Sequence, residues 1–342
     1  MITLMQHSPT NPNNSDFLRL LGVPLLFCSI GICLFLFVFT CSPTRDQART
    51  DYRHVPSEWI TYRQTAVFQC PIEGKATCFA VQNDSTFIVG TADPPALKFF
   101  HNFRALDNFG AFMRKVDLPE EPRAIVCNKE GKIFIAHPHH IAVHSADGYW
   151  ETSWKQYDDK SDIRSLVSTP KYLFAADTGN RSVQRWSFDG NHDLTFGEDF
   201  VVYASPIVMT YSPTTNFLYV ANPGRHRVDV FTQDGIYQPE LSFGEPSASF
   251  SGFAGCCNPI GLAVLDDGRI LTVEKAVSRV KIFKTNGQLD CVVAGYDILE
   301  DTFLKPNQRY FAIAVLSDGS IAVFDFDCAV MHVFEELSER VE

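Results

Sequence analysis

The chain has 342 residues, enough for two average domains or one large all-β domain. Hydrophobic residues make up 45% of it and charged residues 20%, a composition that is typical of globular proteins and excludes a disordered chain. The formal net charge is −11 and Lys and Arg do not cluster, so no nucleic-acid partner is expected.

The first predicted element is an apolar segment near the N-terminus. No charged residue lies between Arg19 and Arg45, and the nearly all-apolar run from Gly22 to Thr40 has about the 20 residues needed to cross a hydrocarbon core. A cleaved signal peptide usually has a shorter core and a small-residue cleavage site, whereas bulky Phe39 and Thr40 end this segment. An uncleaved membrane anchor is therefore favoured over a removed signal peptide. The prediction is an N-terminal tail at 1–16, a single transmembrane helix at 17–42 and a linker at 43–58.

The charges that flank the predicted anchor bear on its orientation. Arg45, Arg49 and Arg53 follow the segment while Arg19 precedes it, and this count alone would place the following domain in the cytoplasm. Long domains, however, are translocated largely regardless of such a bias. The prediction is a single-pass membrane protein whose large domain lies on the extracytoplasmic, periplasmic side.

From about Trp59 onward, short apolar runs alternate with turns and no helical periodicity is found. Asp-Gly and Asn-Gly pairs supply the positive φ angles of tight hairpins. Four such pairs follow one another at separations of 42, 45 and 52 residues: Asp147-Gly148, Asp189-Gly190, Asp234-Gly235 and Asn286-Gly287. A period of about 40–50 residues that contains several strands is typical of the blades of a β-propeller.

Six repeated units can be counted, each with an apolar first strand, a second strand and an alternating third strand. They start near Lys75, Glu121, Asp162, Ser205, Asn258 and Arg309. The last unit ends without an outer strand, and the strand-like segment 59–68 precedes the first unit without a blade of its own. Pairing the two would close the circle and remove an exposed sheet edge. The prediction is an all-β, six-bladed propeller at 59–337, closed by the strand at 59–68, with a tail at 338–342.

Two of the units carry a recognisable motif. Residues 177–186 and 222–231 resemble the NHL repeat, in which an Asp is followed by Gly-Asn-x-Arg and then by Val-x-Val-Phe. The segment 255–259, Gly-Cys-Cys-Asn-Pro, further resembles bacterial membrane-anchored NHL-repeat proteins. The resemblance spans about residues 75–335. It implies an NHL-like propeller that acts mostly as a binding scaffold, and in a minority of cases as a lyase or related enzyme.

The end of the second strand places one residue of each unit at an equivalent position. These residues are Gly90, His137, Asp177, Asn222, Glu274 and Asp325. Repetition puts them on one face, where propellers bind ligands, although Asp and Asn also cap their own turns. Turn capping is favoured for Asp177 and Asn222, whereas Glu274 fits that role less well and is the better functional candidate.

Arginines follow two of these positions by five residues. Arg227 follows Asn222, and Arg279 follows Glu274. Glu274 and Arg279 are expected to form an ion pair within the blade, and the alternative is that the guanidinium binds a ligand carboxylate or phosphate. The nearby histidines His137, His139, His140 and His144 lack an accompanying Cys or Glu. A solvated loop is favoured there over a metal site.

Seven cysteines lie outside the apolar segment, and two of them are adjacent, Cys256 and Cys257. Their loop is bounded by Gly255 and Pro259, and Cys291 stands in the same unit. Three states stay open: a bond between adjacent cysteines or a redox pair, free buried thiols, and thiolates that bind a metal. Because no Cys-x-x-Cys pair accompanies them, a closed four-thiolate zinc or iron–sulfur site is not supported, and no metal or cofactor is assigned.

Two functions follow from these patterns. The first is a membrane-anchored propeller that acts as a scaffold for an unknown protein or small-molecule ligand. The second is a redox-linked or lyase-type enzyme that uses the face around Cys256, Cys257 and Glu274. No nucleophile elbow, phosphate-binding loop or zincin helix occurs in the sequence, but catalytic groups of a propeller can come from separate blades.

Overall fold

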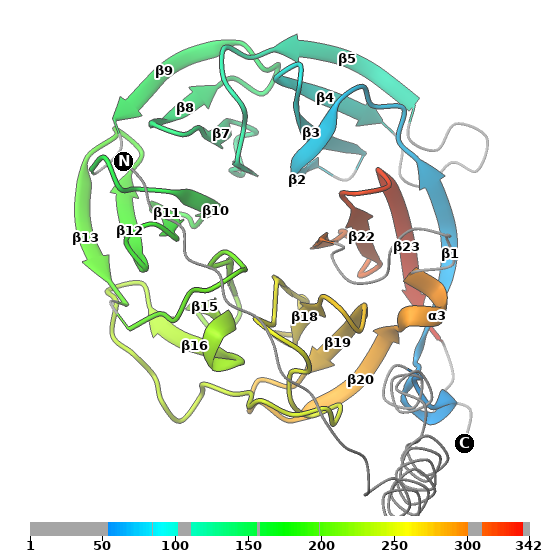
Figure 1. Cartoon of the computed structure of the whole chain (residues 1–342). Coiled ribbons are helices and arrows are strands. Elements are labelled where there is room, and N and C mark those ends of the chain that lie inside the picture. Colours follow the sequence, from blue (N-terminus) through cyan, green and yellow to red (C-terminus); the bar gives the residue numbers. More distant parts are fainter. Residues whose placement is uncertain are drawn as a thin grey trace, which may run out of the picture. The chain divides into compact units, whose positions relative to one another are not determined.

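The computed structural model describes residues 54–83, 85–101, 111–155, 158–197, 199–299 and 310–337. Within them the chain forms six antiparallel sheets that stand in a circle, each sheet being one blade (Figure 1). The predicted all-β, six-bladed propeller is therefore confirmed. The predicted tail at 1–16 and helix at 17–42 lie outside the described residues. Among the residues that are described, no helix is long and apolar enough to cross a membrane.

The strands follow one another outward in each blade. Blades 1 and 2 consist of β2 (Lys75–Asn83), β3 (Thr86–Ala92), β4 (Ala96–His101) and β5 (Ala111–Asp117), and of β6 (Ala124–Cys127), β7 (Ile133–Ala136), β8 (His140–His144) and β9 (Trp150–Lys155). Blades 3 and 4 consist of β10 (Ile163–Ser168), β11 (Tyr172–Asp177), β12 (Ser182–Ser187) and β13 (His192–Phe196), and of β14 (Met209–Tyr211), β15 (Phe217–Asn222) and β16 (Arg227–Thr232). Blades 5 and 6 consist of β17 (Gly261–Val264), β18 (Ile270–Glu274), β19 (Arg279–Phe283) and β20 (Leu289–Ala294), and of β21 (Phe311–Val315), β22 (Ile321–Asp325), β23 (Val330–Glu336) and β1 (Tyr62–Gln69). The short helices are η1 (Ser57–Trp59), η2 (Pro223–Arg225) and α3 (Tyr296–Leu299).

The first strands of the blades form the inner wall of the ring. Each of β2, β6, β10, β14, β17 and β21 contacts the next, and β21 contacts β2. Outermost β5, β9, β13 and β20 lie at the periphery (Figure 1). The second strands are almost wholly buried, as in β18 and β22, because neighbouring blades cover both of their faces.

Apolar clusters between neighbouring blades hold the ring together. Every pair of adjacent blades shares one such cluster; for example, Leu173 of blade 3 packs with Phe134 of blade 2, and Phe174 with Leu218 of blade 4. Alternate residues of a second strand therefore face alternate neighbours. A single blade cannot bury both of its faces, so its stability depends on the blades beside it.

The Asp-Gly and Asn-Gly turns serve this packing between blades. Gly190 has a φ of +89°, and a Cβ added there would lie 2.6 Å from Cδ1 of Trp154 in the preceding blade. Gly287 has a φ of +79°, and its added Cβ would lie 2.5 Å from Cβ of Phe243. Glycine is needed at these positions both for the backbone angle and for the close approach.

β1 completes the sixth blade. It pairs antiparallel with β23, from Tyr62 opposite Glu336 to Gln69 opposite Val330. Blue β1 lies beside red β23 at the edge of the ring (Figure 1). The N-terminal strand thus covers what would otherwise be the free edge of the last blade.

Blade 4 departs from the four-stranded pattern, and this departure positions the loop described below. Its outer place is taken by an irregular segment, in which the amides and carbonyls of Val228 and Phe243 pair at 2.8 and 3.0 Å. The chain then crosses to blade 5 through residues 244–258, here called the crossing loop. It leads directly into β17.

Candidate functional site

The ring of candidate positions at the ends of the second strands faces the neighbouring blade rather than solvent. His137, Asp177, Asn222, Glu274 and Asp325 are all buried, and none is more than 1% exposed. In blade 1 the alternate residues Phe87 and Val89 face the preceding blade. The next residue on that side is Thr91, which is therefore the equivalent residue and is also buried. Gly90 faces the opposite side, so the predicted equivalence was one residue out for this blade.

These buried side chains hold the segment that leads into the first strand of their own blade. Because the strands of a blade are antiparallel, the hairpin between the second and third strands lies at the same face of the ring as the segment that leads into the first strand. This face is called the hairpin face below. The side-chain oxygens accept hydrogen bonds from backbone amides of that segment. Asp177 accepts from Asp162 at 2.8 Å, Asn222 from Val201 at 2.9 Å, and Glu274 from Ala254 at 2.7 Å. His137 Nδ1 lies 3.2 Å from the carbonyl of Glu121. Asp325 accepts from the amides of Asp327 and Cys328 and so caps its own hairpin.

A second set of buried polar residues lies in the third strands, seven positions after the first set, and was not predicted. In five blades it consists of Lys98, Gln184, Asp229, Lys281 and His332, and in blade 2 the residue at this spacing is His144, which is also buried. Gln184 Nε2 donates to Asp177 at 2.6 Å, and Asn222 Nδ2 donates to Asp229 at 2.8 Å. The spacing of seven recurs in the sequence and could have identified these pairs.

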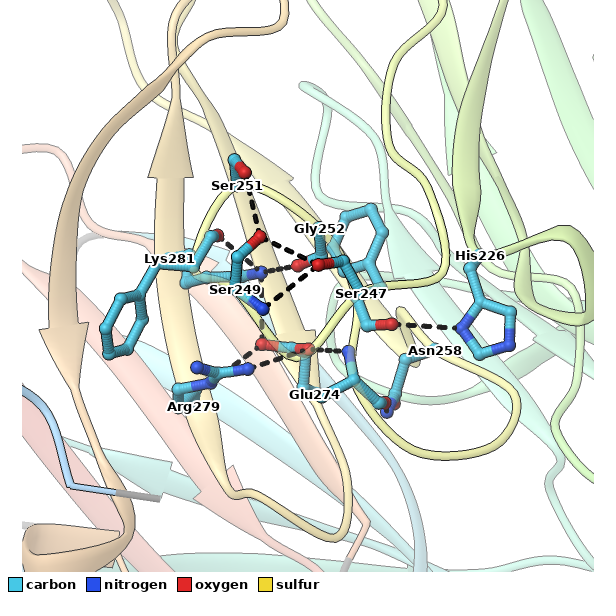
Figure 2. A network of polar contacts seen from close by, with 12 residues as sticks. His226, Ser247, Ser249, Ser251, Gly252, Asn258, Glu274, Arg279 and Lys281 are labelled. Carbon is cyan, nitrogen blue, oxygen red and sulfur yellow. Dashed lines mark hydrogen bonds and ion pairs between the residues drawn. The ribbon is translucent and has the colours of Figure 1, made fainter. Parts of the chain in front are cut away.

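Blade 5 carries the most highly charged version of this arrangement (Figure 2). Arg279 Nε and Lys281 Nζ each lie 3.1 Å from Glu274 Oε2, and all three side chains are fully buried. The predicted Glu274–Arg279 ion pair is therefore confirmed. Burial and the Arg279 charge lower the pKa of Lys281 to about 8, although Glu274 opposes the shift.

The three charged residues hold the crossing loop against blade 5. Lys281 Nζ donates to the carbonyls of Phe250 and Gly252, and Glu274 Oε1 accepts the amide of Ala254 at 2.7 Å. The Arg279 guanidinium stacks over the Phe250 ring at 4.8 Å. Figure 2 shows the loop folded over these side chains, with its serines nearby. Both oxygens of Glu274 are engaged in this network, so we assign the residue to fixing the loop.

The adjacent cysteines lie at the end of the loop that is fixed in this way. Cys256 is exposed, Cys257 is buried, and their sulfurs are 2.9 Å apart as free thiols. Asn258 anchors the backbone beside them, because its side chain donates to the carbonyl of Ala254 at 2.6 Å and accepts the amide of Lys275 at 2.9 Å. The hydrogen bond with Cys257 raises the pKa of Cys256, with a smaller contribution from desolvation.

The remaining predicted site residues are not brought to the cysteines. Cys291 is buried in β20, in the cluster that contains Tyr62 and Val280. Arg227 forms an ion pair with Asp229 at 2.6 Å in blade 4. The predicted candidates therefore divide into separate local interactions, several of them in blade 5, and do not converge on one centre.

A groove between blades 1 and 2 was also not predicted. It has a volume of about 400 Å³ and is lined by Val116, His137, Ala142, His144 and Trp150 among others. In the other five blades the residue two before the end position of the second strand is paired with a long or polar third-strand residue, whereas in blade 2 the residue paired in this way with Ile135 is the small Ala142. The small side chain leaves the space open.

His137 and His144 are buried, in contrast to the solvated loop expected from the sequence, whereas His140 is half-buried and His139 is exposed. His137 is 1% and His144 4% exposed, and the rings of His137 and His140 stack with centroids 4.7 Å apart. Burial and the neighbouring His140 lower the pKa of His137 to about 4, so the ring is neutral at pH 7. Among the residues that the structure describes, no group of three or more His, Cys, Asp or Glu side chains is arranged to hold a metal ion.

Comparison with solved structures gives many matches to this fold. They include a protein of unknown function from Bacteroides thetaiotaomicron, with a TM-score of 0.59, 16% identity and coverage of 80% of this chain and 71% of that one. Virginiamycin B lyase from Staphylococcus aureus matches with a TM-score of 0.57 and 12% identity, over 81% of this chain and 100% of that one. The WD40 β-propeller domain of Doa1 matches with a TM-score of 0.54 and 10% identity, over 82% of this chain and 98% of that one.

These likenesses concern the fold. At 10–16% identity they show that the chain is a propeller and do not transfer a ligand or a reaction. No protein-family model matches the chain, and no curated protein matches its sequence. The resemblance to the NHL repeat stays a prediction.

Proposed function

We propose that this propeller is a binding scaffold and that the groove between blades 1 and 2 receives its ligand. The observation that carries the proposal is a cavity of about 400 Å³ beside two strongly exposed aromatic residues, Tyr149 at 75% and Trp150 at 64%. Ligand pockets commonly measure about 300–1,000 Å³ and are lined mainly by apolar and aromatic groups. Tyr and Trp are also enriched among the residues that dominate binding energies.

The chemistry of the lining defines the class of ligand. Carbonyl oxygens only accept hydrogen bonds, so the contacts of His137 Nδ1 with Glu121 and of His144 Nδ1 with Gly148 assign the proton to Nδ1 in both rings. The opposite nitrogen, Nε2, is then an acceptor. The neutral imidazole of His137 beside Val116, Pro119 and aromatic rings suits an uncharged, ring-bearing group that donates a hydrogen bond. An aromatic side chain of a partner protein has this chemistry.

Site-specific photo-cross-linking in cells tests the groove. A photoreactive phenylalanine at Tyr149 should give a defined adduct with the partner, whereas the same group at Ile236, 61% exposed on blade 4, should not. Ala142→Leu fills the groove and should abolish the adduct at position 149 while the unfolding temperature stays close to that of the parent protein. An adduct that survives Ala142→Leu, or no adduct at position 149, would show that the groove is not the binding site.

We further propose that residues 17–42 anchor the propeller in a membrane, with the propeller on the extracytoplasmic side. The support is the uncharged apolar stretch between Arg19 and Arg45. The full-length chain should stay in the membrane fraction after washing with alkaline carbonate and should keep its original N-terminus. A mature N-terminus at or after Cys41 would indicate a processed or lipidated protein instead.

A further inference from the structure

One thiol of the described chain is far more accessible than the others. Cys256 is exposed, whereas Cys70, Cys78, Cys257 and Cys291 are buried and two others are partly buried. Burial raises the pKa of both Cys70 and Cys78 to about 12, which keeps these thiols protonated and unreactive. A thiol-reactive molecule that approaches the propeller therefore meets Cys256 first.

The second thiol is already placed next to the first. Cys256 Sγ and Cys257 Sγ are 2.9 Å apart, and a disulfide bond is about 2.05 Å long, so a small approach of the two sulfurs suffices for bonding. Cys257 has a φ of +62°, a backbone conformation that non-glycine residues seldom adopt.

Buried contacts on both sides hold this backbone. Glu274 fixes the amide of Ala254, and Asn258 contacts Ala254 and Lys275. The pair is thus held in place by the same network that attaches the crossing loop to blade 5.

We propose that Cys256 and Cys257 are a reversible oxidation site that closes to a disulfide between adjacent residues. The oxidant is a disulfide of the glutathione type, written RSSR. The thiolate of Cys256 attacks one sulfur of RSSR, forms a mixed disulfide and releases RS⁻. The thiolate of Cys257 then attacks Cys256 Sγ and expels the second RS⁻. The two thiols lose two protons and two electrons, and RSSR gains the electrons as two RS⁻.

Such a bond acts as a switch and adds little stability. Consecutive Cα atoms are about 3.8 Å apart, below the usual 4.4–6.8 Å for bonded cysteines, and the resulting strain makes the bond easy to reduce. It closes almost no loop, so it hardly lowers the entropy of the unfolded chain. The bond should change the structure only locally, on the hairpin face beside Lys275. The ammonium group of Lys275 lies 5.6 Å from the centre of the Tyr310 ring.

The sequence around the pair permits an unambiguous measurement. No Lys or Arg occurs between Arg227 and Arg269, and Cys256 and Cys257 are the only cysteines in between. Trypsin therefore releases both thiols on one peptide, residues 228–269, that carries no other cysteine. A loss of two hydrogens from this peptide can come only from a bond between the two.

The experiment treats the full-length protein with oxidised glutathione, blocks free thiols with N-ethylmaleimide and analyses the peptide by mass spectrometry. The expected product is an unblocked peptide lacking two hydrogens, which reverts when reductant is added, while Cys70 and Cys78 stay reduced. In Cys257→Ser the mixed disulfide with glutathione should accumulate at Cys256, by about tenfold over the parent protein, because the second attack is lost. Cys256→Ser should not react.

Two results would overturn the proposal. One is a stable glutathione adduct at Cys256 in the parent protein with Cys257 still free to be blocked. The other is full blocking of both thiols after exposure to oxidised glutathione. Matching unfolding temperatures of the parent protein and both serine variants would show that each result concerns the thiols and not a loss of folding.

Discussion

His137 illustrates how a repeated polar residue can be part of the fold instead of a ligand site. It occupies the same position as Asp177 and Glu274, and each of the three contacts the backbone segment that leads into its own blade. A chain of short repeats needs such contacts because each lead-in segment carries backbone polar groups into the buried interior. The position recurs for this structural reason, and its chemistry differs from blade to blade.

His137 also predicts an acid sensitivity. Its pKa is lowered from 6.5 to about 4 in the folded state, so between these values the unfolded chain binds the proton and the folded chain does not. The stability that comes from neutral His137 is present above pH 6.5 and is lost as the pH falls towards 4. The loss should reach about 3 kcal/mol, since one pKa unit corresponds to about 1.4 kcal/mol.

Urea unfolding at pH 7, 5.5 and 4.5 measures this effect by comparing His137→Gln with the parent protein. The variant should lose less stability on acidification than the parent protein does. His101→Gln, exposed at the end of β4, is the matched control and should follow the parent protein. Equal slopes for His137→Gln and the parent protein would rule out His137 as the sensitive group.

At the scale of elements, the blades could be predicted from the sequence because their signals are local. Alternating apolar residues and the Asp-Gly turns predicted six sheets, and the turn at Gly190 is where its hairpin forms. The groove could not be predicted, because it depends on Ala142 facing a neighbouring blade and on a hairpin that brings His137 and His140 together. A groove between blades is lined by side chains of two packed blades. The sequence of a single repeat does not contain this information.

The crossing loop is the element whose attachment depends most on charge. Glu274 compensates both Arg279 and Lys281, so removing its charge leaves two buried cations without a counterion. Glu274→Gln should therefore destabilise the propeller by about 3–5 kcal/mol. Lys281→Met should cost less, because Glu274 and Arg279 remain as a balanced pair, and the double variant should be more stable than Glu274→Gln alone.

Two measurements check this prediction. Urea unfolding gives the free energies, and hydrogen exchange at Ala254 reports whether the loop is released, since its amide is bonded to Glu274. Lys284→Met, which removes a half-exposed lysine just after β19, controls for the change in net charge. The charge argument fails if Lys281→Met is as destabilising as Glu274→Gln, or if the double variant shows no recovery.

For the whole molecule, closure of the ring is the feature on which stability should depend most. β1 is the only strand of blade 6 that precedes the other blades in the sequence, and it covers the edge of β23 over its whole length. Without it, β23 presents a free edge, and Phe334 and Met331, which are fully buried, lose their cover. An open edge of this kind also invites pairing between molecules.

Two truncations separate closure from the rest of the N-terminal region. A chain that starts at His54 keeps every described strand and should unfold like the full-length protein. A chain that starts at Cys70 lacks β1 and should lose several kcal/mol, a large share of the roughly 5–15 kcal/mol that is typical of a folded domain. It should also associate on size-exclusion chromatography through the free edge of β23. Adding a peptide of residues 57–71 should restore both the unfolding midpoint and the monomer, whereas a scrambled peptide should not. Equal midpoints for the two truncations would mean that the ring holds together without its closing strand.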